Sequence, residues 1–300
     1  MSVAKYYPFN GSKNRLRLGL TSIPESEWIQ YEKDLPERIA QKKKLIYEQP
    51  NRVIQYSDES LSAQRELLQN IISYLAKYKS DLFILNDSSI TSYTEGITYE
   101  FEKYKNNPLE LISYLVADDF CLLEKFNDDY RLVAGSVCSP TYWELSEKIG
   151  KPMKDVHAPI PNLEDRIGHM IRHFFSGLNT DVYYQRSNWF IMSNSDLTLF
   201  KDDSNPDKEI NNLNISNIED KLFLRSERQT FRKLSKTKNI AFGIKIYVSP
   251  LSILKKHTLI AEDLIQGLNT MSVDQKEIMG VSLYEDLLEI YLHGILDNKY

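Results

Sequence analysis

Residues 119–137 read DFCLLEKFNDDYRLVAGSV, and this stretch decides how the rest of the chain is interpreted. Two strand-like runs, 119–126 and 130–137, flank the triplet 127–129 (Asn-Asp-Asp), which is typical of a hairpin turn. Three further runs rich in β-branched and aromatic residues follow at 183–192, 222–231 and 240–248. The sequence therefore predicts five strands, in the order of a hairpin, a connection and three more strands.

Helical patterns surround these strands. Before the hairpin, two apolar stripes at helical spacing are formed by Leu35, Ile39 and Ile46, and by Leu61, Leu68, Ile71, Ile72 and Leu75. The basic run 42–44 is interpreted as a solvated helix face. The connection predicts helices over 142–149 and 163–178, and the polar stretch 202–220 predicts an exposed loop. In the tail, Ser272 and Gln275 have capping-box spacing, and an apolar helix face is formed by Tyr284, Leu287, Leu288, Tyr291 and Ile295.

The order of elements predicts an α+β fold. Two strands, a helical connection and then three strands are the order of a PAS-type sheet, so we expect a PAS-like five-stranded antiparallel sheet with helical N- and C-terminal extensions. We expect one domain, with a helical region at about 20–110, a PAS-like core at about 118–250 and a helical tail at about 251–300.

Composition excludes several classes of protein. The chain has 300 residues, a net charge of -5 and a pI of about 5.7, which does not fit a nucleic-acid-binding surface. No apolar run is long enough to span a membrane, and the first residues lack the apolar segment of a signal peptide. The two cysteines, Cys121 and Cys138, are interpreted as buried free thiols. We therefore expect a cytoplasmic protein.

One histidine stands in a stiffened segment. Residues 151–161 read KPMKDVHAPIP, so three prolines surround His157. Proline restricts its own φ and the residue before it, which would hold the imidazole in place as a metal or haem ligand. A purely structural role for His157 is the alternative. Glycine-rich nucleotide loops and the usual zinc motifs are missing from the sequence.

Two strands carry charges where apolar residues are expected. Alternation places Tyr184, Arg186, Asn188 and Phe190 on one face of the 183–192 run. In the 222–231 run, Arg225, Glu227 and Gln229 share a face and Arg228 lies opposite. Breaks in a strand pattern are expected at functional sites. An internal salt-bridge network is the alternative.

His169 and His173 are four residues apart on a predicted helix and so share a face. This spacing suits a metal, but no third ligand accompanies the pair in the sequence. A solvated or core-packed pair is the favoured interpretation.

Taken in order, these segments resemble the haem-dependent oxidative N-demethylase family. The resemblance runs from Gly19 to about Leu254, and its motifs lie at 118–124, 132–140, 143, 147–150, 157–161, 186–189 and 224–234. Two positions depart from the family pattern: Asn162 replaces a frequent glycine and Phe231 a frequent leucine.

The resemblance implies a PAS-like haem b protein that removes a methyl group from a small secondary or N-methylated amine with O2, releasing formaldehyde. His157 matches the motif histidine and takes the axial-ligand role by resemblance. Glu227 and Trp189 are candidate catalytic residues that receive the cationic amine. Candidate cofactor-binding residues are His157, Arg186, Asn188, Arg225, Arg228 and Gln229, the arginines being suited to haem propionates.

Electrons must come from a separate reductase, because the sequence has no glycine-rich dinucleotide loop and too few cysteines for an iron–sulfur cluster. NADPH and flavin are therefore expected only on that partner. Two other functions stay open: a haem-PAS gas sensor without turnover, and a non-catalytic subunit of an amine oxygenase.

Overall fold

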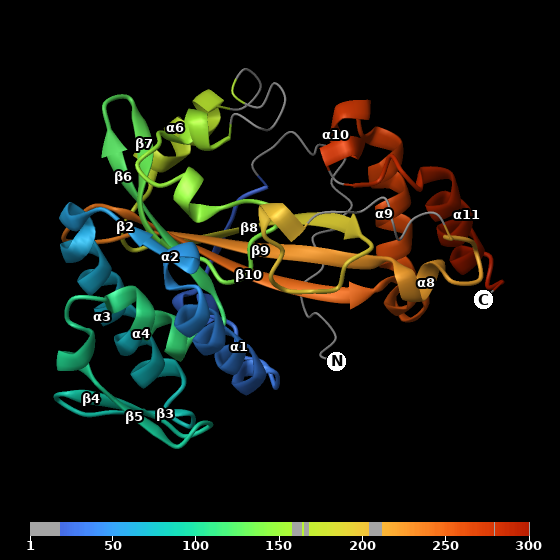
Figure 1. Ribbon diagram of the computed structural model, residues 1–300. Coiled ribbons are helices and arrows are strands. Elements are labelled where there is room, and N and C mark those ends of the chain that lie inside the picture. Colours follow the sequence, from blue (N-terminus) through green and yellow to red (C-terminus); the bar gives the residue numbers. More distant parts are fainter. Residues whose placement is uncertain (1–18, 158–163, 165–167, 204–211, 279, 300) are drawn as a thin grey trace.

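The computed structural model describes residues 19–157, 164, 168–203, 212–278 and 280–299. The described residues form an α+β fold around a seven-stranded antiparallel sheet with the strand order β1-β8-β9-β10-β6-β7-β2 (Figure 1). A separate three-stranded antiparallel sheet has the order β3-β4-β5. The strands are β1 (Thr21–Ile23), β2 (Ile54–Tyr56), β3 (Phe83–Leu85), β4 (Ser89–Ser92), β5 (Ile97–Glu100), β6 (Asp119–Phe126), β7 (Asp129–Ser136), β8 (Tyr183–Met192), β9 (Phe223–Lys233) and β10 (Ile240–Pro250).

The five predicted strands are confirmed as β6 to β10, each within two residues of the expected bounds. Asn127 opens the β6–β7 turn with a φ of 52°, a left-handed conformation that asparagine tolerates. The expected number of strands in the sheet was wrong. The three-residue strands β1 and β2 pair with β8 and β7 and extend the sheet at both edges. Such short runs carry almost no periodicity, so the sequence pattern did not reveal them.

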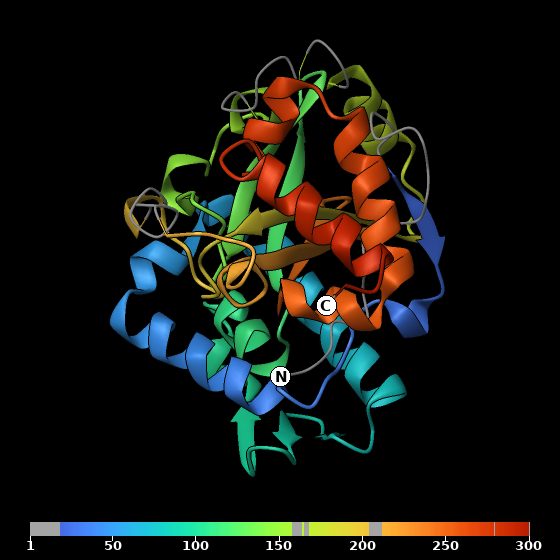
Figure 2. The ribbon, with the colours of Figure 1, turned by 90° about the vertical axis from the view of Figure 1, so that its right-hand side faces the viewer.

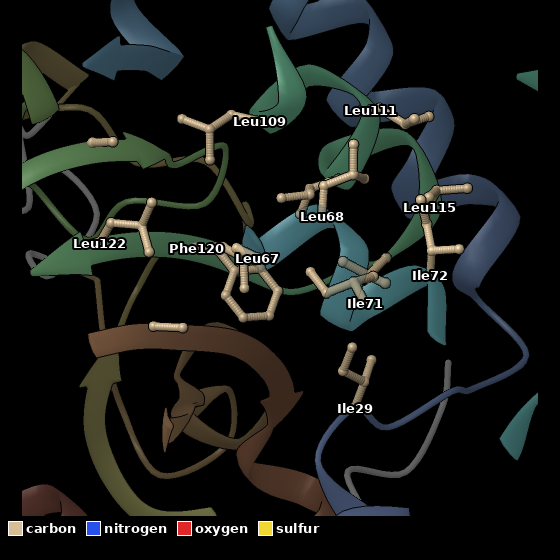
Figure 3. Close-up of a cluster of buried hydrophobic side chains, with 14 of the residues drawn as sticks. Ile29, Leu67, Leu68, Ile71, Ile72, Leu109, Leu111, Leu115, Phe120 and Leu122 are labelled. Atoms are coloured by element: carbon tan, nitrogen blue, oxygen red, sulfur yellow. The ribbon is translucent and has the colours of Figure 1, made fainter. Parts of the chain in front are cut away.

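The N-terminal helices cover one face of the sheet with the largest apolar core. They include α1 (Leu35–Glu48), α2 (Pro50–Val53), α3 (Leu61–Tyr78) and α4 (Pro108–Leu115). Leu67 and Ile71 of α3 and Leu111 of α4 are fully buried, and they share a cluster with Phe120 and Leu122 of β6 (Figure 3). The apolar stripes predicted for α1 and α3 thus pack as expected, although Leu61 stays partly exposed.

The C-terminal helices α9 (Thr258–Thr270), α10 (Val273–Ile278) and α11 (Glu285–Leu296) gather at the other end of the long strands (Figures 1 and 2). Leu288, Tyr291 and Ile295 of α11 are buried in a second cluster, as the predicted apolar face requires. The predicted capping box is confirmed: the Ser272 backbone N–H donates to Gln275 Oε1 at 3.0 Å. The short helix α8 (Ile218–Lys221) joins this cluster through Ile218.

Two predicted segments differ in the structure. The helix expected over 142–149 is replaced by a short 3-10 turn, Leu145–Glu147, preceded by Tyr142 with a φ of 57°. Backbone pairing of Thr141 and Tyr142 with Leu199 holds this conformation in place of a helix. The predicted loop 202–220 is not wholly exposed, because Ile218 is buried; residues 204–211 lie outside the described part of the chain.

The solvated face predicted for residues 42–44 was also wrong at one position. Lys42 is only 3% exposed, because α1 places it on the same stripe as Ile39 and Ile46. Lys44 is exposed as expected. The remaining helices are α5 (Met153–Val156) and α6 (His169–Gly177), which belongs to the helix predicted over 163–178. Within the described residues, no helix is long and apolar enough to cross a membrane. The division into one domain with three regions stays a prediction.

Candidate functional site

The predicted polar faces of β8 and β9 meet on one side of the sheet. The strand register pairs Arg186 with Gln229 and Asn188 with Glu227. We call the side of the sheet that carries these four residues the site face. Glu227 is buried, whereas the other three residues, Arg186, Asn188 and Gln229, are partly exposed. The site face is therefore partly accessible to solvent. The sequence therefore identified a real cluster of polar side chains on adjacent strands.

Both carboxylate oxygens of Glu227 accept a hydrogen bond from a neighbouring side chain. Thr141 Oγ1 donates to Glu227 Oε1 at 2.9 Å, and Gln229 Nε2 donates to Glu227 Oε2 at 3.0 Å. Each oxygen of a carboxylate has more than one acceptor position, so these two bonds leave capacity for another donor. A cation with N–H groups is the kind of ligand that such a carboxylate receives.

Arg186 differs from the other two arginines of the predicted set, because its side chain has no hydrogen-bond partner among the described residues. Its Nε atom is buried and has no hydrogen-bond partner among the described residues. Burial lowers the pKa of Arg186, and the charge of Glu227 opposes that shift, so the two groups lie close enough to interact. A buried guanidinium donor without an acceptor is costly, and a bound anion would relieve that cost.

Arg225 makes its hydrogen bonds within the protein. It is fully buried, and its side chain donates five hydrogen bonds, to Thr141 Oγ1 and to the backbone oxygens of Ser139, Pro140, Asp196 and Leu197. Burial lowers its pKa to about 10. All three nitrogens of Arg225 donate within the protein, so this side chain joins two loops beside Glu227, and its pairing with a propionate stays a prediction.

Arg228 and Trp189 lie on the opposite face of the sheet. Arg228 Nη1 donates to the Trp28 carbonyl at 3.0 Å, and its Nε donates to Gln185 Oε1 at 3.0 Å. Trp189 is 5% exposed and packs in the cluster of the C-terminal helices. The alternation of side chains along β8 and β9 therefore separates both residues from Glu227.

His157 directly follows α5 and is positioned by it. An isolated bridge between Arg131 and Pro152 fixes the start of α5 against β7, and Met153 packs in the apolar cluster of the site face. Lys148 Nζ donates to the Val156 carbonyl at 2.7 Å, which satisfies an acceptor at the end of this helix. The prolines at 159 and 161 lie outside the described residues, so their predicted bracing of His157 stays a prediction.

The electrostatic surroundings keep the imidazole of His157 neutral. Burial lowers the pKa of His157 to about 4, and the positive charges of Lys148 and Arg186 act in the same direction. A neutral imidazole is the form that binds a metal. The charge of Arg186 contributes to this lowered pKa, so the His157 and Arg186 side chains lie within electrostatic range of each other.

The other metal and thiol candidates are not assembled into a site. His169 and His173 are both exposed on α6, which agrees with the favoured interpretation of a solvated pair. Among the described residues, no group of three or more His, Cys, Asp or Glu side chains is arranged to hold a metal ion. Cys121 and Cys138 are buried free thiols as predicted, and burial raises the pKa of each to about 12.

An aromatic group borders the site face on the side of α6. Phe231 and Phe242 stack with ring centroids 4.8 Å apart, and Phe174 of α6 meets Phe231 edge-on at 5.5 Å. Phe231 is one of the two departures from the family pattern, and its ring fills this aromatic group. The other departure, Asn162, lies outside the described residues.

Residues 19–288 match the family model described as haem-dependent oxidative N-demethylase, alpha subunit-like. The chain belongs to this family. The match spans α5, His157 and strands β6 to β10, so every residue of the site face lies within the family region. The family description names haem, so the question is whether the residues of this site could hold a haem group.

Sequence reasoning missed Thr141 and Lys148. Thr141 follows the motif segment that ends at Pro140, and Lys148 lies inside another motif segment. The sequence signal that could have indicated these two residues is their position directly after, or inside, a motif segment. Their contacts with Glu227 and with the end of α5 depend on tertiary packing, which alternation within one strand does not reveal.

Proposed function

We propose that this chain binds haem b through His157 and oxidatively removes a methyl group from a small secondary or N-methylated amine. The observation that carries the proposal is the pair of Arg186, whose buried Nε has no acceptor among the described residues, and Glu227 on one face of the sheet, with the neutral His157 within electrostatic range of Arg186. Together these provide an iron ligand, an anion partner and a cation partner. Membership of the family supports this combination.

The residues fit a haem group. His157 would supply the axial nitrogen, and Arg186 would pair with a propionate, which gives its buried Nε an acceptor. Of the three predicted arginines, Arg225 and Arg228 already bind backbone carbonyls. Haem, when bound, supplies the reduction and activation of O2. We assign the five central strands, β6 to β10, as the PAS-like core that holds it.

Glu227 would receive the substrate. A dialkylamine is protonated at neutral pH, and a carboxylate held by two neutral donors orients such a cation. Asn188 and Gln229 stand beside it on the same face and would complete the polar wall. Trp189 would act indirectly, since it packs β8 against the C-terminal helices from the opposite face.

Oxidation of the N-methyl group gives a carbinolamine, which collapses to formaldehyde and the demethylated amine. The two electrons would come from NADPH through a flavin on a separate reductase. We place the reaction in the cytoplasm, where cysteine thiols stay reduced.

The test mixes haem-loaded protein, NADPH, O2 and dimethylamine, with and without an added flavin reductase. We expect formaldehyde release only when the reductase is present. Release without it would show that the chain carries its own nicotinamide site. A stable haem spectrum with no release under any electron source, including chemical reduction, would favour the gas-sensor function.

A further inference from the structure

Thr141 joins the two charged residues of β9. Its hydroxyl donates to Glu227 Oε1 at 2.9 Å and accepts from Arg225 Nε at 2.9 Å. A hydroxyl has one proton, so the bond from Arg225 commits that proton to Glu227. The arginine therefore acts on the carboxylate through Thr141, without a direct ion pair.

The backbone around Thr141 is fixed from several sides. Asp119 Oδ2 accepts from the backbone N–H groups of Cys138 at 3.0 Å and Ser139 at 2.7 Å. Arg225 donates to the Ser139 and Pro140 carbonyls at 3.2 and 3.1 Å. The position of the Thr141 side chain is thus set by contacts with both β6 and β9.

The next residue shows how firmly this segment is held. Tyr142 has a φ of 57°, a left-handed conformation that bulky side chains rarely adopt. Its backbone N–H donates to the Leu199 carbonyl at 2.8 Å, and the Leu199 N–H donates to the Pro140 carbonyl at 3.1 Å. A disfavoured conformation persists where surrounding contacts over-determine it, and such residues gather at functional sites.

We infer that Thr141 is a positioning residue that fixes the Glu227 carboxylate to receive the ammonium group of the substrate. This inference rests on the proposed function of Glu227 as the partner of the amine. Without the hydroxyl, Glu227 Oε1 loses its donor, and only the bond from Gln229 Nε2 to Oε2 still orients the carboxylate. Amine binding then loses its oriented partner, although the charge on Glu227 is unchanged.

The test compares Thr141→Val with Thr141→Ser in haem-loaded protein, with dimethylammonium chloride as the ligand in calorimetric titrations. We expect Thr141→Val to raise the dissociation constant about ten-fold, the effect of about one lost charge-assisted hydrogen bond. Thr141→Ser keeps the hydroxyl and should stay within about three-fold of the wild type, because its donor is retained. Haem content and the thermal midpoint are recorded for each variant.

A double-mutant cycle with Glu227→Gln separates this inference from the proposed function. If Glu227→Gln leaves amine affinity unchanged, the proposed substrate role of Glu227 fails. If Glu227→Gln weakens binding and Thr141→Val does not, the role of Thr141 is overturned. We expect Thr141→Val to add little in the Glu227→Gln background.

Equal losses in Thr141→Val and Thr141→Ser would also overturn the inference, since the hydroxyl would then not be the deciding group. If Thr141→Val does not fold, Thr141→Ala removes the hydroxyl without the extra methyl group and replaces it in the cycle. Failure of both to fold would show that Thr141 is needed for the fold alone, which contradicts a specific role toward Glu227.

Discussion

Lys42 and Asp119 form a buried ion pair that joins α1 to β6. Lys42 Nζ lies 3.1 Å from Asp119 Oδ1, and both side chains are at most 4% exposed. The ammonium group also donates to the carbonyls of Val116 and Asp118 at 3.2 and 2.7 Å. Because the other oxygen of Asp119 holds the backbone of Cys138 and Ser139, this pair connects the N-terminal helices to the segment that carries Thr141.

We predict that Lys42→Met lowers the free energy of unfolding by about 3–5 kcal/mol, since removing one partner leaves Asp119 as a buried uncompensated charge. Lys44→Met makes the same change in net charge at an exposed position and should stay within about 0.5 kcal/mol of the wild type. Urea unfolding measures both. Similar values for the two variants would contradict the importance of the pair.

Arg186→Leu should weaken haem binding by about 10- to 100-fold, the range that the loss of a charge-assisted hydrogen bond would give. The apoprotein should keep its thermal midpoint, because Arg186 Nε has no acceptor to lose among the described residues. Titration of the apoprotein with haemin measures the affinity. Arg65→Leu removes the same positive charge from an exposed position of α3 and is the control, which should keep the wild-type haem affinity. A stable fold with wild-type haem affinity would remove Arg186 from the site.

His157→Ala should abolish the Soret band of the purified protein or shift it strongly, because the axial nitrogen would be missing. His173→Ala changes an exposed histidine of α6 and should leave the spectrum unchanged. An unaltered spectrum with stoichiometric haem in His157→Ala would exclude His157 as the ligand. His169 and His173 would then be the next candidates.

Glu66 gives the fold a specific dependence on pH. Its carboxylate accepts from the backbone N–H groups of Lys236 and Thr237 at 2.7 and 2.8 Å, so α3 holds the turn between β9 and β10. Burial raises the pKa of Glu66, but these hydrogen bonds outweigh it, and the net shift is below the usual 4.5. A lowered folded-state pKa stabilises the fold above the unfolded-state value, and that stability is lost as the pH falls through the folded-state pKa.

The difference in unfolding free energy between the wild type and Glu66→Gln should therefore be largest near neutral pH and shrink in acid below the usual pKa of 4.5. Urea unfolding across this range measures it, with Glu59→Gln as a control at an exposed position. A difference that is constant with pH would show that the charge of Glu66 does not hold the turn.

Much of the fold followed from the sequence because alternation and turn chemistry are local. The bounds of β6 and β8 were predicted to the residue, and the shared face of Arg186 and Asn188 followed from the period of a strand. Lys42 was misjudged as part of a basic run. Its spacing from Ile39 and Ile46 already placed it on the buried stripe, and that signal was overlooked.

The roles of the arginines were not predictable in the same way. Arg225 and Arg228 are only three residues apart in the sequence, yet each binds a different set of backbone carbonyls contributed by distant segments. Only tertiary contacts show that their donors are occupied whereas Arg186 Nε is not. The missing helix at 142–149 has a similar explanation. Tyr142 adopts a left-handed conformation and its backbone N–H binds the carbonyl of Leu199, which is far along the chain.

The two short edge strands also bear on how this protein avoids aggregation. β1 occupies the outer edge of β8 at Tyr183, Tyr184 and Gln185, and β2 occupies that of β7 from Ala134 to Ser136. A three-residue strand offers few free backbone groups to a neighbouring molecule, whereas a long uncovered edge is a template for adding strands. Deleting residues 19–23 would uncover part of a ten-residue strand and promote edge-to-edge association between copies of the chain.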